Sequence, residues 1–441
     1  MVSAFTVMRT LSALMASVAM LMLSNSVLST LIALRGKAEG YSNTFIGLTM
    51  SAYFVGFCIG TFRSGTLINR VGHIRSFAAF AAIASASTLC FVLVLHPWAW
   101  LISRLAMGAS IAGLFVIAES WLNNRASNEG RGTILALYIM IGYLAAALGQ
   151  QMLHLAEPAA PDLFLLVAML LSLSLVPVSL TRATHPDPVE SPRLDIRRLL
   201  FTSPAAVAGC FAAGMGIGAF WGLGPVYAQE IGLDITGVAT FMSVALVGGL
   251  IFQLPIGRLS DRLDRRNVLL GTTLVSALLA VGLALAPALP YPVLLGTVLL
   301  YYGLTSTLYP LSLAYANDHL DAGDVARLTS GFVLAFSAGA VLGPLAASSL
   351  MKWTGPSGLF LFQILIAAGL ALFILWRMRV RIWSGLVAKA PYVALPDAQT
   401  PVIVAELDPR ASVGDYYDSG PDTLVSPRSI APGESNNETE R

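Results

Sequence analysis

The sequence contains little charge. Only 50 of its 441 residues are Lys, Arg, Asp or Glu, and they nearly cancel to a net charge of +2. Soluble domains carry about 25% charged residues, whereas this chain carries 11%, too few to cover a water-exposed surface. The small net charge also excludes nucleic-acid binding, which needs a concentrated basic surface. The expected partners are therefore a lipid bilayer and small molecules.

Cysteine and catalytic groups are also scarce. The three cysteines, Cys58, Cys90 and Cys210, are an odd number and lie in apolar stretches, a pattern typical of packing and not of disulfides. The sequence has no set of nucleophile and base, no cluster of metal ligands and no Walker-type phosphate loop. It thus predicts a protein that is no enzyme, holds no metal or cofactor and does not use ATP directly.

Long apolar runs, in contrast, are abundant, since 56% of the residues are hydrophobic. A membrane-spanning helix needs roughly 20 apolar residues, and twelve such runs occur in two sets of six. The first set covers about 8–34, 44–62, 76–95, 98–122, 133–155 and 161–180; the second covers about 203–228, 235–256, 267–287, 290–316, 328–351 and 357–377. These runs predict an all-α membrane protein.

The two sets divide the chain into four parts. We predict an N-terminal six-helix bundle at 1–180, a central cytoplasmic loop with three prolines at 181–202, a C-terminal six-helix bundle at 203–377 and a disordered cytoplasmic tail at 378–441. After Arg381 the tail has a net charge of −5 and is rich in Pro, Ser, Asp and Glu, so it is expected to stay solvated. An inert tail is the simpler interpretation, and a regulatory or partner-binding tail is the alternative.

Basic residues predict the orientation, because cytoplasmic loops retain Lys and Arg. With the N-terminus inside, 18 basic residues lie in or next to cytoplasmic loops, against only Arg35, Lys37 and Lys352 outside. Both termini of this multi-pass protein are therefore expected in the cytoplasm, and the membrane is expected to be a cell membrane of the bacterial inner-membrane type.

An internal repeat relates the two sets of runs. GTLINRVGHIR begins at Gly65 and GRLSDRLDRR begins at Gly257, so that Arg70 matches Arg262 at an offset of 192. Asn123 with Asn317, Leu148 with Leu342 and Gly149 with Gly343 match at an offset of 194. Two features that repeat at nearly the same offset indicate six spans plus six, with a site expected between the halves.

These loops resemble the G-x-x-x-D-R-x-G-R-R signature of the major facilitator superfamily of secondary transporters. The second copy keeps Gly257, Asp261, Arg262, Arg265 and Arg266, with Asp264 at the second glycine position. The first copy keeps Gly72 but has Asn69, His73 and Ile74 at the other positions. Further similarities are Arg104, Gly108 and Ala112 on span four and Gly339, Gly343 and Pro344 on span eleven. The resemblance implies a twelve-helix fold of two pseudo-symmetric bundles.

The loop residues are candidates for gating. Glycine permits a tight helix exit, Asp or Asn can cap a neighbouring helix, and the arginines can pair with acids at helix ends. We therefore predict a latch that holds one of two rocking states, made by Asp261, Arg262 and Arg265 together with Gly257. A weaker counterpart comprises Gly65, Asn69 and Arg70.

Two charges lie well inside the spans, Arg104 and Glu119, both on span four. Charges in hydrocarbon are costly and point to function. Arg104 is expected roughly 10 Å from the outer end of its span, where it would bind an anionic group of the solute, influence a proton site, or bond carbonyls and lock the packing. Glu119 lies near the inner end and is predicted to be a gating partner of Arg70, His73 or Arg75 rather than a transported-proton site.

Polar and aromatic side chains within the spans are candidates for a solute-binding surface. Interface anchoring is the alternative for the aromatic ones. The predicted set is Asn25, Tyr53, Gln150, Trp221, Tyr227 and Tyr302.

Together these features predict a monomeric secondary transporter that moves a small organic solute by alternating access. Proton coupling is expected, and Gly343 with Pro344 gives a lean towards efflux. The alternative is a non-transporting sensor or a lipid scramblase with the same fold.

Overall fold

The computed structural model describes residues 4–125, 131–180, 199, 203–285, 289–318, 322–380 and 392–395. Most of the predicted central loop and most of the predicted tail lie outside these residues. The described chain is almost entirely helical, and twelve helical segments are long and apolar enough to cross a membrane. The prediction of an all-α membrane protein with twelve spans is therefore confirmed.

Seven α-helices are described in the N-terminal half. They are α1 (Ala4–Ala38), α2 (Asn43–Val71), α3 (His73–Leu93), α4 (Pro97–Arg125), α5 (Arg131–Gln151), α6 (Asp162–Leu173) and α7 (Leu175–Ser179), with the short 3-10 helix η1 (Met152–His154) after α5.

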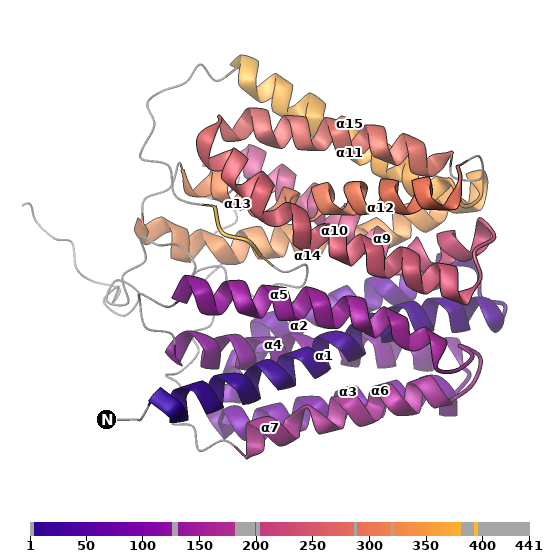
Figure 1. The fold of residues 1–441 in the computed structure, drawn as a ribbon, viewed down its shortest axis with the longest axis vertical. Coiled ribbons are helices and arrows are strands. Elements are labelled where there is room, and N and C mark those ends of the chain that lie inside the picture. The colour runs from indigo at the N-terminus through magenta and orange to yellow at the C-terminus, as the bar shows by residue number, and fades with distance from the viewer. Residues whose placement is uncertain are drawn as a thin grey trace, which may run out of the picture.

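The C-terminal half also contains seven described α-helices. They are α9 (Pro204–Glu230), α10 (Ile235–Arg262), α11 (Arg265–Ala284), α12 (Tyr291–Thr305), α13 (Leu308–Asn317), α14 (Ala322–Thr354) and α15 (Gly358–Val380). Figure 1 shows the two halves as two bundles side by side. We call the end of the bundles where α1 begins and α15 ends the terminal end, and the opposite end the far end.

Two spans are broken where the sequence shows continuous apolar runs. Span six consists of α6 and α7, which meet at Ser174, and span ten consists of α12 and α13, which meet at Ser306 and Thr307. A proline follows each break, Pro177 in α7 and Pro310 in α13. Because proline lacks an N–H and crowds the carbonyl one turn earlier, each break falls within the turn that precedes a proline.

The repeat seen in the sequence recurs as repeated contacts. A Cβ at Gly149 would overlap the carbonyl oxygen of Leu23, and a Cβ at Gly343 would overlap that of Met215, which is Leu23 plus 192. These glycines let α5 approach α1, and α14 approach α9, at backbone distance.

A second pair of helices shows the same relation. Gly56 lies on the carbonyl of Leu105, and Gly248 lies on that of Leu299. The α2–α4 contact of the first half therefore recurs as the α10–α12 contact of the second half. Repeated backbone contacts, and not only repeated hydropathy, make the two bundles pseudo-symmetric.

The turns at the far end are repeated as well. Gly40 precedes α2 with φ 77° and Gly232 precedes α10 with φ 97°, a conformation that glycine adopts without strain. Two residues after each glycine an N-cap side chain accepts a backbone hydrogen bond: Ser42 from Phe45 and Asp234 from Gly237. The same local chemistry thus reverses the chain at the far end of both halves.

The halves meet mainly where α2 packs on α14 and α5 packs on α10, and α1 also contacts α9. On the far-end side of the molecule these contacts are close. The Ser51 hydroxyl donates to the carbonyl of Val341, 2.6 Å away, and a Cβ at Gly47 would lie 2.7 Å from the carbonyl oxygen of Pro344. The interface between the bundles is therefore tightly packed along the far-end parts of α2 and α14.

Candidate functional site

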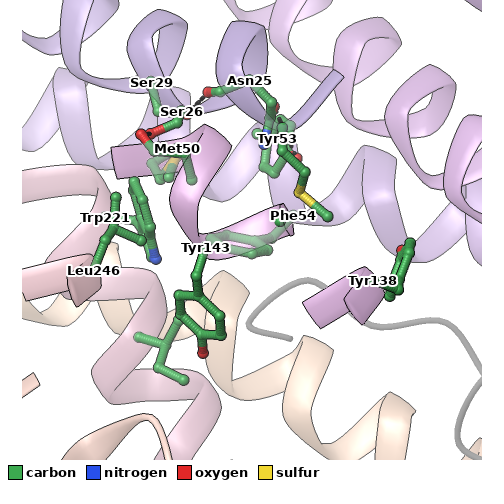
Figure 2. Close-up of a pocket in the computed structure, with 14 residues that line it drawn as sticks. Asn25, Ser26, Ser29, Met50, Tyr53, Phe54, Tyr138, Tyr143, Trp221 and Leu246 are labelled. Atoms are coloured by element: carbon green, nitrogen blue, oxygen red, sulfur yellow. Dashed lines mark hydrogen bonds between the residues drawn. The ribbon is translucent and has the colours of Figure 1, made fainter. Parts of the chain in front are cut away.

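A pocket lies between the two bundles, near the middle of the spans. The space not filled by atoms among its lining side chains is about 710 Å³, open solvent included. Figure 2 shows its side chains converging from α1, α2, α5, α9 and α10, so both halves contribute. The lining residues are Met22, Asn25, Ser26, Ser29, Met50, Tyr53, Phe54, Tyr138, Gly142, Tyr143, Ala146, Ile217, Trp221 and Leu246.

Three of the predicted solute-binding residues line this pocket: Asn25, Tyr53 and Trp221. The Tyr53 hydroxyl donates to the Asn25 side-chain oxygen at 3.2 Å, which fixes the amide. The Trp221 indole donates to the Tyr302 hydroxyl at 2.8 Å, so Tyr302 orients the indole ring from outside the lining. Aromatic and hydroxyl groups thus surround a largely apolar space.

Like Tyr302, the predicted residues Gln150 and Tyr227 lie away from the lining. Gln150 is fully buried and ties α5 to α1: its Nε2 donates to the Ser26 hydroxyl at 2.7 Å, and its Oε1 accepts from the Thr30 hydroxyl at 2.8 Å. Tyr227 is also fully buried and donates to the carbonyl of Leu283, on α11. Both side chains use their hydrogen-bonding groups to join helices within one half.

Arg104 lies directly behind one wall of the pocket. Its Nη2 donates to Ser29 Oγ at 3.3 Å and lies 3.1 Å from Met50 Sδ, and its guanidinium carbon lies 4.5 Å from the centre of the Tyr53 ring. All three of these neighbours line the pocket. The side chain is 1% exposed, and its Nε and Nη1 have no hydrogen-bond partner among the described residues. A cationic group with unused donors therefore adjoins the pocket.

Glu119 is linked to the pocket by Tyr138. The carboxylate is 2% exposed and accepts a hydrogen bond from the Tyr138 hydroxyl at 3.2 Å. Tyr138 itself lines the pocket. His73, one of the residues proposed as a gating partner for Glu119, lies beside the next residue of α4, with its Nε2 3.4 Å from Ser120 Oγ. The structure thus places a buried acid one side chain away from the pocket.

The far end of the pocket region is closed by polar contacts between the halves. Lys37 forms a 2.8 Å ion pair with Glu230, and Asn43 donates to the same carboxylate oxygen at 3.0 Å. Deeper in, the Gln151 amide donates to Ser243 Oγ at 2.6 Å. These contacts join α1, α2 and α5 to α9 and α10, and they close the path between the pocket and the far end.

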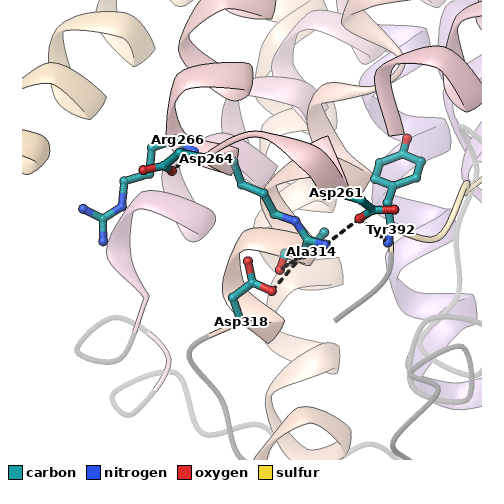
Figure 3. Close-up of polar contacts among 7 residues, drawn as sticks. Asp261, Asp264, Arg266, Ala314, Asp318 and Tyr392 are labelled. Atoms are coloured by element: carbon teal, nitrogen blue, oxygen red, sulfur yellow. Dashed lines mark hydrogen bonds and ion pairs between the residues drawn. The ribbon is translucent and has the colours of Figure 1, made fainter. Parts of the chain in front are cut away.

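At the terminal end, the predicted latch residues form an ion-pair network within the second half. Arg265 is 2% exposed and bonds Asp261 at 2.8 Å and Asp318 at 3.0 Å, and it donates to the carbonyl of Ala314 at 2.6 Å. Figure 3 shows Asp261, Ala314 and Asp318 around this guanidinium. The network joins α10, α11 and the end of α13. Arg262, also predicted, is exposed to solvent.

The cap of α11 at this turn is Asp264, whereas Asp261 was the acid expected to act as a cap. Asp264, which stands at the second glycine position of the signature, accepts a hydrogen bond from the Arg266 N–H and caps α11. Asp261 is thereby free to bind Arg265. The departure from the signature at position 264 therefore has a local function.

The N-terminal copy of this turn is built differently. Gly72 joins α2 to α3 with φ 90° and provides no side-chain cap. His73, which corresponds to Arg265, stacks on Trp121 at a centroid distance of 6.0 Å. Gly65 is buried within α2, whereas Asn69 and Arg70 are exposed. This copy therefore has no Asp–Arg–Asp arrangement at the matching described positions.

Sequence reasoning missed Asp318, Tyr138 and Tyr143. Asp318 directly follows Asn317, a residue that the repeat had already marked, so its position next to a matched residue was an available signal. Tyr138 and Tyr143 lie on α5, whose apolar run gives no indication of which face meets the other half. No group of three His, Cys, Asp or Glu side chains among the described residues could hold a metal ion.

The family model of the Major Facilitator Superfamily matches residues 14–308 and 206–405 of this chain. The MFS-type transporter YcaD of Escherichia fergusonii is 28% identical over 372 residues, which cover 83% of this chain and 94% of YcaD. YcaD of Shigella flexneri is equally similar.

Solved structures show the same fold. The nucleoside transporter NupG superposes with a TM-score of 0.72 at 15% identity, covering 85% of this chain and all of NupG. A bacterial homologue of the human lysosomal transporter Spinster, in an inward-facing and unoccupied conformation, superposes with a TM-score of 0.66 at 14% identity, covering 87% and 99%. With its twelve spans and its pocket between two bundles, this chain belongs to the major facilitator superfamily and is a membrane transporter of the secondary type, not an enzyme.

Proposed function

We propose that this protein moves a small organic solute across a cell membrane by alternating access, in which the halves 1–180 and 203–377 rock about the pocket. The observation that carries this proposal is a pocket lined by both halves and closed at the far end by contacts between them. Rocking that breaks those contacts would open the same pocket towards the far end. The distribution of basic residues supports a cytoplasmic terminal end.

The lining favours a solute with an apolar body and an acidic group. Apolar and aromatic side chains make up most of the surface, and the hydroxyls of Ser29 and Tyr53 mark one polar wall. Arg104 lies behind that wall with two donor nitrogens that have no partner among the described residues. An acidic group at Ser29 would gain the attraction of this charge at low dielectric, where it is strong.

Proton coupling is assigned to Glu119. A buried carboxylate that accepts a hydrogen bond from a pocket-lining tyrosine responds to what occupies the pocket, because a ligand that draws the Tyr138 hydroxyl away removes a stabilising donor. Loss of that donor would favour the protonated acid. This contact supports a role in proton transfer more strongly than the gating role expected from the position of Glu119 in the sequence.

We further propose transport in the direction of efflux. The support is the Gly343–Pro344 pair on α14, which resembles the motif of antiporters. In this structure Gly343 packs on α9, so the pair would act where these helices slide during rocking. A proton entering through the far end would then drive the solute out.

The proposal can be tested with purified protein in liposomes. A thermal-shift screen of organic acids, nucleosides and drugs would first identify a stabilising solute, and flux of that solute would then be measured with and without a pH gradient. Arg104→Gln should weaken the apparent affinity for an acidic solute at least tenfold, and Glu119→Gln should abolish the response to the pH gradient. Glu157→Gln, at an exposed acid after η1, is the matched control and should change neither.

Other results of these experiments would contradict the proposal. Flux that Arg104→Gln leaves intact would contradict the binding role, and flux that is indifferent to pH in the unaltered protein would contradict proton coupling. Scrambling of labelled lipid with no solute flux would contradict transport of a small solute and would support the rival function, a lipid scramblase.

A further inference from the structure

A short C-terminal segment, Tyr392–Leu395, is docked on α10 at the terminal end. The Tyr392 N–H donates to Asp261 Oδ1 at 2.9 Å. The Leu395 N–H donates to Gln253 Oε1 at 3.1 Å, and Gln253 Nε2 donates back to the Leu395 carbonyl at 2.7 Å. Leu395 is 1% exposed. A segment predicted to be disordered and solvated is thus held here by three hydrogen bonds and a buried leucine.

The Tyr392 ring lies against Gly257, the glycine that opens the second copy of the repeated loop. A Cβ at this position would overlap the ring at three carbon atoms. Asp261, on which the Tyr392 N–H docks, is the acid of the same loop and also binds Arg265 (Figure 3). The loop therefore provides both an apolar seat and a hydrogen-bond acceptor for the segment. These contacts explain why residue 257 must be glycine when the segment is docked.

The Tyr392 hydroxyl contributes nothing to this docking through hydrogen bonds, since it is buried without a partner in the described chain. Burial of the ring, and next the negative charge of Asp261, raise the pKa of this phenol. The tyrosine therefore docks as a neutral, apolar ring.

The docked segment lies between the pocket and the terminal end. Gln253, which holds Leu395, also donates to the Tyr143 hydroxyl at 2.9 Å, and Tyr143 lines the pocket. Gln253 is seven residues beyond the pocket residue Leu246 on α10, which is about 10 Å nearer the terminal end. In Figure 1 the segment is the short gold piece between the two bundles. Since Lys37–Glu230 joins the halves at the far end, the segment stands on the opposite route, from the pocket to the terminal end.

We propose that Tyr392–Leu395 is a tethered plug, an autoinhibitory contact that blocks the terminal-end exit of the pocket until it leaves its seat on Gly257 and Asp261. A plug has a role only if the protein transports a solute, so this inference rests on the proposed function. The docking of the segment itself does not depend on transport. Chain length permits the arrangement, because the twelve residues from Val380 to Tyr392 can span up to about 40 Å when extended.

Docking is tested by hydrogen–deuterium exchange on the full chain in detergent or nanodiscs. The amides of Tyr392 and Leu395 should exchange slowly, because both donate hydrogen bonds. Gly257→Ala should abolish this protection. Gly271→Ala is the matched control on α11, where an added Cβ meets no atom within 4 Å, and it should keep the protection. Fast exchange of the segment in the unaltered chain would overturn the proposal.

Plugging is tested by thiol labelling in the same full chain. Cys58, Cys90 and Cys210 are replaced by serine or alanine, Leu246→Cys is introduced, and a membrane-impermeant maleimide is added from the terminal end in oriented vesicles. Gly257→Ala, Leu395→Asp and removal of residues after Val380 should each speed labelling at least tenfold. Gly271→Ala and Tyr392→Phe should leave it slow, since the phenolic hydroxyl has no partner.

An equal or slower labelling rate in the released variants would overturn the plug, even if exchange shows that the segment is docked. Neither experiment requires a known solute or active transport. Failure of the plug would therefore be distinguishable from failure of the proposed function, which is measured by flux.

Discussion

The α1–α2 and α9–α10 turns at the far end are nearly identical, whereas the α2–α3 and α10–α11 turns at the terminal end are not. Gly40 with Ser42 and Gly232 with Asp234 provide the same backbone conformation and the same kind of cap. At the terminal end the first half has a glycine turn followed by His73, and the second half has a network in which buried Arg265 binds Asp261 and Asp318. The repeat has thus retained its packing and its far-end turns while its terminal-end charges have diverged.

This difference indicates that the second half carries the residues that control the terminal end. In the second copy, Asp261 Oδ1 accepts a hydrogen bond from the Tyr392 N–H of the C-terminal segment, and Gly257 packs against the Tyr392 ring. In the first copy, His73 stacks on Trp121. Substitutions at matched positions of the two copies test this comparison directly.

The largest asymmetry is expected at Arg265 and its counterpart His73. Arg265→Met takes the shared cation away from buried Asp318 and exposed Asp261, and the loss at Asp318 should destabilise the protein by about 3–5 kcal/mol. His73→Met should cost about 1 kcal/mol, because it removes a weak hydrogen bond and a ring contact. Thermal unfolding of the purified protein in detergent would measure both.

A second change separates charge from packing at this site. Adding Asp318→Asn to Arg265→Met removes the buried carboxylate charge that has lost Arg265 and should recover part of the lost stability. If the double variant were no more stable than Arg265→Met alone, the network would be holding the helices by shape and not by charge.

The packing glycines, in contrast, should behave alike in both halves. Gly149→Val and Gly343→Val each place side-chain atoms on a backbone carbonyl of the partner helix, and each should cost about 3 kcal/mol or more. The yield of monodisperse protein and its melting temperature would report the effect. Clearly unequal losses would argue against pseudo-symmetric packing of α1 with α5 and α9 with α14.

A smaller asymmetry is expected at the turns themselves. Gly72→Ala forces a side chain into φ 90° and should cost about 2 kcal/mol, whereas Asp264→Ala loses a cap worth about 1 kcal/mol. Asp264→Gly should cost only a few tenths of a kcal/mol, since glycine is tolerated at a cap position. Melting temperatures of the three variants that fell in another order would contradict these assignments.

The smallest effect is expected at the matched arginines Arg70 and Arg262. Both are exposed, so Arg70→Ala and Arg262→Ala should each change the free energy of unfolding by less than about 0.5 kcal/mol. Arg262 was expected to belong to the latch. A large loss of stability in Arg262→Ala, measured by the same thermal unfolding, would restore that role.

Part of the site could be predicted from the sequence. Asn25, Tyr53 and Trp221 were chosen as polar or aromatic groups within spans, and they line the pocket; Gln150 and Tyr227 met the same criterion and are used in packing. The criterion identifies groups that need a partner in hydrocarbon. It does not say whether that partner is another helix or a solute, because this depends on the rotation of each helix about its axis.

By itself, the sequence determined the twelve spans, the six-plus-six repeat and the loop residues worth naming, because hydropathy and local turn chemistry act over stretches of about 20 residues or fewer. Only the tertiary structure decided that Arg265 binds Asp318 and that Leu395 docks on Gln253. These contacts join residues 53 and 142 positions apart. They exist only once the helices have packed, so no local pattern in the chain could specify them.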